Sequence, residues 1–123
     1  MKLIYICGPF RAETYWAQEQ NVRVAEDAAV SCWRHGFAVI CPHANTRFFQ
    51  GAVPDKVWLE GDLEIVRRCD ALYLVDGWQH SEGASGEIEL AGKLGIPVFS
   101  DFGALLAWGD AHAGVSIGRD ARH

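Results

Sequence analysis

The sequence predicts an α/β fold: one domain built on a parallel sheet of about four or five strands, with helices on both faces. Two patterns predict it. Short apolar segments alternate with longer segments of helical periodicity along most of the chain. The apolar segments are hydrophobic nearly throughout, which is typical of parallel strands buried on both faces. With 123 residues, half of them hydrophobic, the chain has room for one such domain.

Four apolar segments are expected to form the strands, because each is rich in Ile, Val, Leu, Tyr and Phe and ends at a polar or turn-forming residue. They are residues 2–7, 37–41, 71–76 and 96–99. Helices are expected between them, at residues 13–35, 56–69 and 84–94. Gly36 and Gly95 supply the stops of the first and third helices. This order implies right-handed crossovers, flavodoxin-like or Rossmann-like in outline.

The last part of the chain has a weaker pattern. Residues 103–123 are expected to form a C-terminal tail that packs on the domain of residues 1–102 or on a neighbouring subunit. Within it, residues 103–108 are predicted to form a helical turn, and residues 115–123 look loose or dependent on a partner. A chain this short exposes much surface for its volume, so self-association would help it.

Composition argues against several classes of protein. The formal net charge of −5 disfavours long DNA or RNA as a partner, because polymer binders rely on a broad basic face. The apolar runs are far shorter than the roughly 20 residues of a membrane helix. Residues 1–7 have no long apolar region or cleavage site, so they are interpreted as a strand and not a signal peptide. Four cysteines without CxxC spacing indicate a reduced, cytoplasmic protein with no metal site.

Ligands of an open parallel sheet bind beyond the carboxyl ends of its strands. This rule selects residues 8–11, 42–45, 76–83 and 100–101. No Walker loop and no GxGxxG motif occurs there, so no dinucleotide, triphosphate or other cofactor is expected.

Glu87 is the first candidate for chemistry. It follows a Gly-rich turn and is expected in the first turn of the third helix, where backbone N–H groups favour an ionised carboxylate suited to attack a carbon atom. Complementarity to the helix terminus alone is the alternative reading. Asp62, expected on the preceding helix, can supply a second carboxylate, and Glu60 and Glu64 compete for that role. An ordinary acidic helix start is the alternative reading.

Further candidates surround these two carboxylates. Gly8, Pro9, Phe10 and Arg11 follow the first strand, where Arg11 can clamp an anion or form a surface ion pair. Other candidates for binding are Ser81 and Gly83 as a small anion cradle, Asn45 with His43 as polar contacts, and Trp78 as a cover over the pocket. His43 and Trp78 each have a structural alternative, as a core histidine and a half-buried core tryptophan.

These motifs together resemble the nucleoside 2-deoxyribosyltransferase superfamily, most closely its small members grouped as a domain of unknown function. The resemblance covers roughly the first hundred residues. It is carried by Tyr5-Ile6-Cys7-Gly8-Pro9-Phe10-Arg11, by Asp62 with Cys69-Asp70-Ala71, and by Ser81-x-Gly83-x-x-x-Glu87. It implies an α/β domain over residues 1–102, and a homodimer or larger oligomer whose neighbour completes the pocket.

The resemblance also implies a chemistry. Glu87 would attack C1' of a 2'-deoxynucleoside or its 5'-monophosphate, and water or another base would then take the deoxyribosyl group. Asp62 matches the second carboxylate of the family. Arg11 and Ser81 match the phosphate-binding positions of the related 2'-deoxynucleoside 5'-monophosphate N-hydrolases, whereas Pro9 departs from that branch, which has serine there. A nucleotide-binding or sensing module without catalysis, and a flavodoxin-like interaction protein, are the alternatives.

Overall fold

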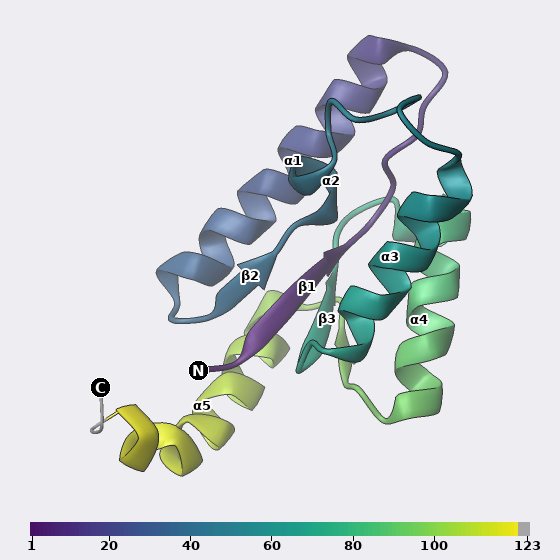
Figure 1. The fold of residues 1–123 in the computed structure, drawn as a ribbon. Helices are drawn as coiled ribbons and strands as arrows, with labels where there is room; N and C mark the ends of the chain where they lie inside the picture. Colours follow the sequence, from purple (N-terminus) through teal and green to yellow (C-terminus); the bar gives the residue numbers. More distant parts are fainter. Residues whose placement is uncertain (121–123) are drawn as a thin grey trace.

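The structure, a computed structural model, describes the backbone of residues 1–120 and the side chains of residues 1–112. Four parallel strands form one sheet in the order β2-β1-β3-β4 (Figure 1). The strands are β1 (Leu3–Cys7), β2 (Ala38–Ile40), β3 (Ala71–Leu74) and β4 (Val98–Phe99). This confirms the predicted α/β fold with a parallel sheet, and each expected apolar segment contains one strand.

The helices follow the expected order, with additions at the strand ends. They are α1 (Tyr15–Arg34), α2 (Pro42–Asn45), α3 (Asp55–Arg67), η1 (Trp78–His80), α4 (Glu82–Leu94) and α5 (Phe102–Asp120). The short elements α2 and η1 were not expected. Helix α4 begins two residues before the predicted start, because the Ser81 hydroxyl accepts a hydrogen bond from the Ala84 N–H at 3.1 Å and caps the helix there.

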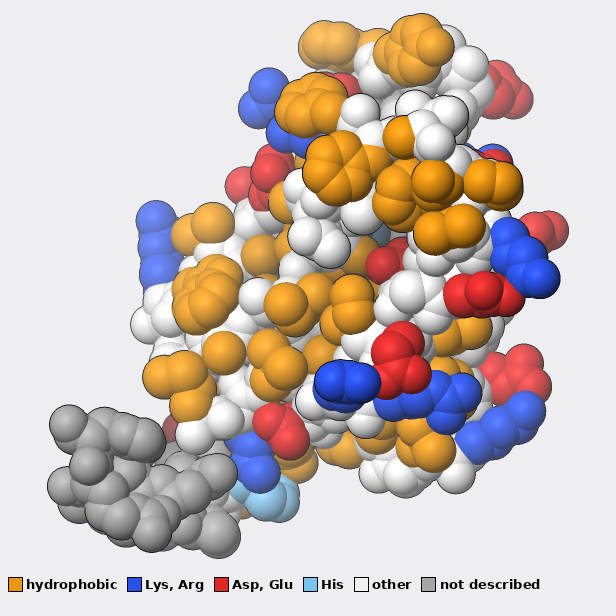
Figure 2. Space-filling model, viewed as in Figure 1, with side chains coloured by type: hydrophobic (Ala, Val, Ile, Leu, Met, Phe, Trp, Pro, Cys, Tyr) orange, Lys and Arg blue, Asp and Glu red, His pale blue; other side chains and the backbone are white. Residues whose placement is uncertain are grey.

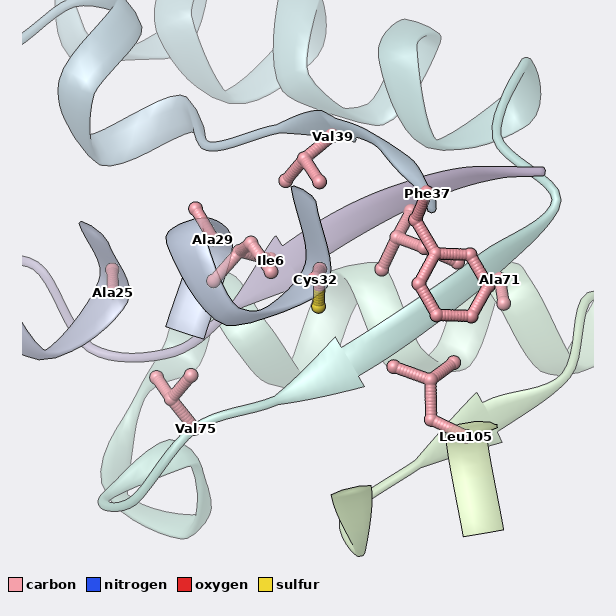
Figure 3. Packing of buried hydrophobic residues seen from close by; sticks show 10 residues of the cluster. Ile6, Ala25, Ala29, Cys32, Phe37, Val39, Ala71, Val75 and Leu105 are labelled. Carbon is pink, nitrogen blue, oxygen red and sulfur yellow. The ribbon is translucent and has the colours of Figure 1, made fainter. Parts of the chain in front are cut away.

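Helices cover both faces of the sheet (Figure 1). Successive residues of a strand point to opposite faces, so the two sides of β1 enter different cores. Ile4 and Ile6 pack with α1 and α5, in the cluster shown in Figure 3, where Leu105 of α5 is fully buried. Tyr5 and Cys7 pack on the other side with α3 and α4.

The C-terminal segment is more helical than expected. Helix α5 spans Phe102–Asp120, so it includes the predicted turn at 103–108 and continues into the segment expected to be loose. Asp101 starts this helix, since its carboxylate accepts a hydrogen bond from the Ala104 N–H at 2.9 Å. Residues 121–123, the end of the expected tail, lie outside the described residues. Within the part of the chain that the structure describes, no helix has the length and apolarity to span a membrane.

A close approach of two chain segments sets the position of the loop after β1. The Val75 N–H donates to the Cys7 carbonyl at 2.9 Å, which brings the segment after β3 against Gly8. A Cβ atom placed on Gly8 would lie only 2.2 Å from Cγ2 of Val75. Any residue other than glycine at position 8 would therefore force Val75 to move.

We expect Gly8→Ala to lower the free energy of unfolding by about 1–3 kcal/mol, because the added methyl group overpacks the contact with Val75. Urea unfolding measures this change. Adding Val75→Ala should recover part of the loss by removing the clashing atom. Gly92→Ala is the matched control, since a Cβ atom there meets nothing within 4 Å and alanine favours the helix. Wild-type stability of Gly8→Ala would contradict the argument.

Candidate active site

A cavity of about 570 Å³ opens beyond the carboxyl ends of β1, β2 and β3, between α3 and α4. Apart from the competing Glu60 and Glu64, nine of the eleven candidate residues line it: Gly8, Pro9, Phe10, Arg11, His43, Asp62, Ser81, Gly83 and Glu87. The segment 100–101 after the edge strand β4 does not contribute to the lining. Three of the four segments selected at the carboxyl ends of the strands therefore contribute to the cavity.

The remaining two candidates lie outside this cavity. Asn45 is exposed at the end of α2, and Trp78 is half-buried against the core between the sheet and α4. Neither residue lines the cavity, so the substrate contacts expected of Asn45 and the covering role expected of Trp78 stay predictions. The sequence pattern does not show which residues after a strand point into a cavity and which lie beside it.

Glu87 extends from α4 into the bottom of the cavity and is 9% exposed. Both of its carboxylate oxygens face a donor on β1. The Tyr5 hydroxyl donates to Oε2, and the Cys7 thiol donates to Oε1 at 3.2 Å. Burial and the nearby Glu87 charge raise the pKa of both donors, so each keeps its proton at neutral pH.

The expected electrostatics of Glu87 are wrong in one respect. Because Ser81 caps α4, Glu87 lies in the second turn and not in the first, beyond the strongest reach of the helix terminus. Burial raises its pKa to about 7, although the hydrogen bonds from Tyr5 and Cys7 act in the opposite direction. The carboxylate therefore titrates near neutrality, where sequence reasoning predicted a stably ionised group.

Asp62 lies in the middle of α3, which begins at Asp55, so it is not part of an acidic helix start. It lines the cavity, and burial raises its pKa to about 6. Its charge also raises the pKa of Glu87, so the two carboxylates interact. The competing candidates Glu60 and Glu64 are exposed, form ion pairs along α3, and do not line the cavity.

The segment after β1 forms another wall of the cavity. His43, which is buried, donates from Nε2 to the Pro9 carbonyl at 2.8 Å, and burial lowers its pKa so that the ring is neutral. The Phe10 ring meets the His43 ring edge-on, with the centroids 5.8 Å apart. His43 thus holds Pro9 and Phe10 in place. Arg11 forms an ion pair with Asp55 at the mouth.

Sequence reasoning did not select Tyr5 as a functional residue. Its position within a run of apolar residues suggested packing alone, and the residue is indeed fully buried. One signal was present. A phenol in a strand buried on both faces needs a hydrogen-bond partner inside the protein, and such partners are polar groups on a facing helix. Glu87 is that partner.

Replacing Glu87 should change the pH dependence of stability. A pKa raised from 4.5 to about 7 disfavours the folded state of the wild type as pH rises from about 4.5 through 7, by at most about 3 kcal/mol. Glu87→Gln has no such titration, so its stability relative to the wild type should increase over that range. Urea unfolding at pH 5 and pH 8 measures the difference.

Glu89→Gln makes the same change on the exposed side of α4, where Glu89 pairs with Lys93 at 3.3 Å. This control should follow the wild type at both pH values. A Glu87→Gln variant that also follows the wild type at both pH values would show that burial does not disfavour the ionised carboxylate.

Comparison with known proteins places the chain in a family. A family model described as Domain of unknown function (DUF7768) matches residues 2–101. A solved structure of a 2-deoxyribosyltransferase from the psychrotolerant bacterium Bacillus psychrosaccharolyticus is similar in fold, with a TM-score of 0.55 and 24% identity over 78% of this chain and 69% of that chain. No curated protein matches. Because the family model covers most of the chain, the protein belongs to the DUF7768 family.

Proposed function

We propose that the protein cleaves the N-glycosidic bond of a 2'-deoxynucleoside or its 5'-monophosphate, by hydrolysis or by transfer to another base. One observation carries the proposal: Glu87 is a buried carboxylate at the bottom of a cavity, with each oxygen facing a donor on the central strand. The fold it shares with a 2-deoxyribosyltransferase supports the same chemistry.

Glu87 acts as the nucleophile in this proposal. One carboxylate oxygen attacks C1' of the deoxyribose, and the C1'–N bond breaks with its electron pair going to the base, which takes up a proton. Water or a second base then displaces Glu87 from C1', and the proton that it loses passes to the carboxylate of Asp62, the group that protonated the leaving base. Tyr5 and Cys7 fix the carboxylate from the side of β1, so the attack geometry is set before the substrate binds.

Asp62 supplies the proton to the leaving base. In the empty cavity Glu87 has the higher pKa, about 7 against about 6, because it is more deeply buried. A bound substrate shields Asp62 from water as well, which reduces that difference. Glu87 then retains two donors that stabilise its ionised form, whereas no donor contacts Asp62 among the described residues. The mechanism requires the proton on Asp62 in the complex, and both of these effects favour that arrangement.

The remaining walls bind the substrate. Phe10, held by the contact of Pro9 with His43, offers an aromatic edge to the base. Gly8 has no side chain, so the sugar can approach the backbone at this position. Its other side packs against Val75. Ser81 and Gly83, at the start of α4, contact the polar groups of the deoxyribose. No cofactor is required for this chemistry.

A nucleotide-binding or sensing module is the second candidate function. It uses the same cavity without a reaction, but it gives no reason to bury a carboxylate whose pKa is raised to about 7. The interacting pair of Glu87 and Asp62 favours an enzyme, because groups that titrate near neutrality suit proton transfer at physiological pH.

A homodimer or larger oligomer completes the proposal. Hydrophobic side chains gather over the start of α1, the segment between α2 and α3, and the first part of α3 (Figure 2). The exposed members are Tyr15, Trp16, Phe48, Phe49, Val53, Val57 and Leu59. Leu59 also lines the cavity. A neighbouring subunit on this surface would bury aromatic groups beside the mouth, which is the contribution we assign to it.

We expect the wild type to release free base from a panel of 2'-deoxynucleosides and their 5'-monophosphates, and Glu87→Ala to lose more than about a thousandfold in rate while remaining folded. Chromatography of the products measures both. Glu89→Gln is the control, because it alters α4 without reaching the cavity. An added free base that yields a new nucleoside identifies a transferase. Full activity of Glu87→Ala would exclude the mechanism.

Removing the Tyr5 hydroxyl should move the pH profile. Its hydrogen bond lowers the pKa of Glu87, so Tyr5→Phe raises that pKa, and the acidic limb of kcat/KM shifts to higher pH by about one unit. Initial rates between pH 5 and pH 9 measure the shift. Tyr73→Phe removes a hydroxyl from β3 away from the cavity and should leave the limb in place. If the acidic limb of Tyr5→Phe stays at the wild-type pH, ionisation of Glu87 does not control turnover.

A further inference from the structure

The charges around the cavity are strongly unequal. Four acidic side chains line it, at Asp55, Asp62, Glu82 and Glu87. Among the described lining residues, Arg11 is the only lysine or arginine. Arg11 is already paired, because its guanidinium contacts the carboxylate of Asp55 across the mouth. Even with Asp62 protonated, three carboxylates face one guanidinium, so a negatively charged ligand entering this cavity meets more repulsion than attraction.

The ion pair joins two segments that are remote in sequence. Arg11 belongs to the loop after β1, and Asp55 is the first residue of α3. Both side chains are about half exposed, at 63% and 48%, so the pair adds little to stability. Its effect is on the ligand: any anion bound by Arg11 would lie next to the Asp55 carboxylate, which repels it.

The start of α4 is the other place where an anion could bind. Backbone N–H groups converge there, but the Ser81 hydroxyl already accepts the N–H of Ala84 at 3.1 Å. Glu82 follows directly, so the first turn of the helix carries its own negative charge beside the cavity. A phosphate at this helix start would be repelled by the Glu82 carboxylate, which already interacts with the positive end of the helix dipole.

We infer that Asp55 determines the substrate class: by holding Arg11 and repelling anions at the mouth, it makes the cavity select the uncharged 2'-deoxynucleoside over its 5'-monophosphate. The inference rests on the proposed glycosidic activity and narrows its substrate. Asp55 acts here through charge alone. It needs no contact with the reacting atoms, which lie at the Glu87 side of the cavity.

The test compares 2'-deoxyadenosine with its 5'-monophosphate in the wild type and in Asp55→Asn. We expect the wild type to have the higher kcat/KM for the nucleoside. Asp55→Asn should raise the kcat/KM of the monophosphate relative to the nucleoside by at least about tenfold, since it frees Arg11 and removes the repelling charge. Adding Arg11→Gln to Asp55→Asn should abolish that gain. Higher ionic strength should narrow the wild-type preference.

Glu60→Gln is the matched control. It removes one negative charge from the same helix, where Glu60 pairs with Lys56 at 3.5 Å outside the cavity lining. Its substrate ratio should equal that of the wild type. A wild type that prefers the monophosphate, or an Asp55→Asn ratio that equals the ratio of Glu60→Gln, would overturn the inference.

Failure of the proposed function gives a different result. If neither compound releases adenine with any variant, the glycosidic activity is wrong, and titration calorimetry of the same two compounds then tests the role of Asp55 directly. Tighter binding of the nucleoside by the wild type, with the monophosphate gaining at least about tenfold in Asp55→Asn, would support the selection by charge. Equal Kd ratios in the two proteins, or no binding of either compound, would overturn it.

Discussion

The hydrogen bonds from Tyr5 and Cys7 to Glu87 join the central strand to α4, and the rest of the site is arranged around them. They place a carboxylate inside a face of the sheet that is otherwise hydrophobic. Burial raises the pKa of Glu87, and the hydrogen bonds from the two donors lower it. The balance leaves Glu87 able to gain or lose a proton near neutral pH. A glutamate on the surface would stay ionised there, and a buried glutamate without hydrogen-bond donors would stay protonated.

The walls of the cavity depend on contacts that are independent of this carboxylate. Gly8 allows β1 to end against Val75, and His43 holds the carbonyl of Pro9. Both contacts fix the backbone, so the position of the loop after β1 does not rely on a bound ligand. The mouth is different, since the ion pair of Arg11 and Asp55 is half exposed and can rearrange at low energetic cost. The cavity is thus rigid at its bottom and adjustable at its entrance.

The repeating pattern of the chain was sufficient to predict the strands and long helices, because buried parallel strands and amphipathic helices differ in period and length. It was also sufficient to predict nine residues that line the cavity, because parallel strands bring their carboxyl ends to one edge. The short elements α2 and η1 carry too few residues to show a period. The helix start at Ser81 was missed. The upward shift of the Glu87 pKa was missed because it comes from burial, which depends on how distant segments pack. The pairing of Arg11 with Asp55 is a long-range contact that no local pattern encodes.

Successive side chains of β1 point to opposite faces of the sheet, so the folding of the core and the geometry of the site both depend on the register of this strand. Ile4 and Ile6 complete one core, while Tyr5 and Cys7 hold the carboxylate on the opposite side. A slip of one residue in the pairing of β1 with β3 would exchange these two sets, placing a phenol among the alanines of α1 and removing both donors from Glu87. A misaligned molecule would be poorly packed and would lack the donors to its buried carboxylate. Under the proposed function, turnover per mole of protein would report the fraction of molecules whose central strand is correctly registered.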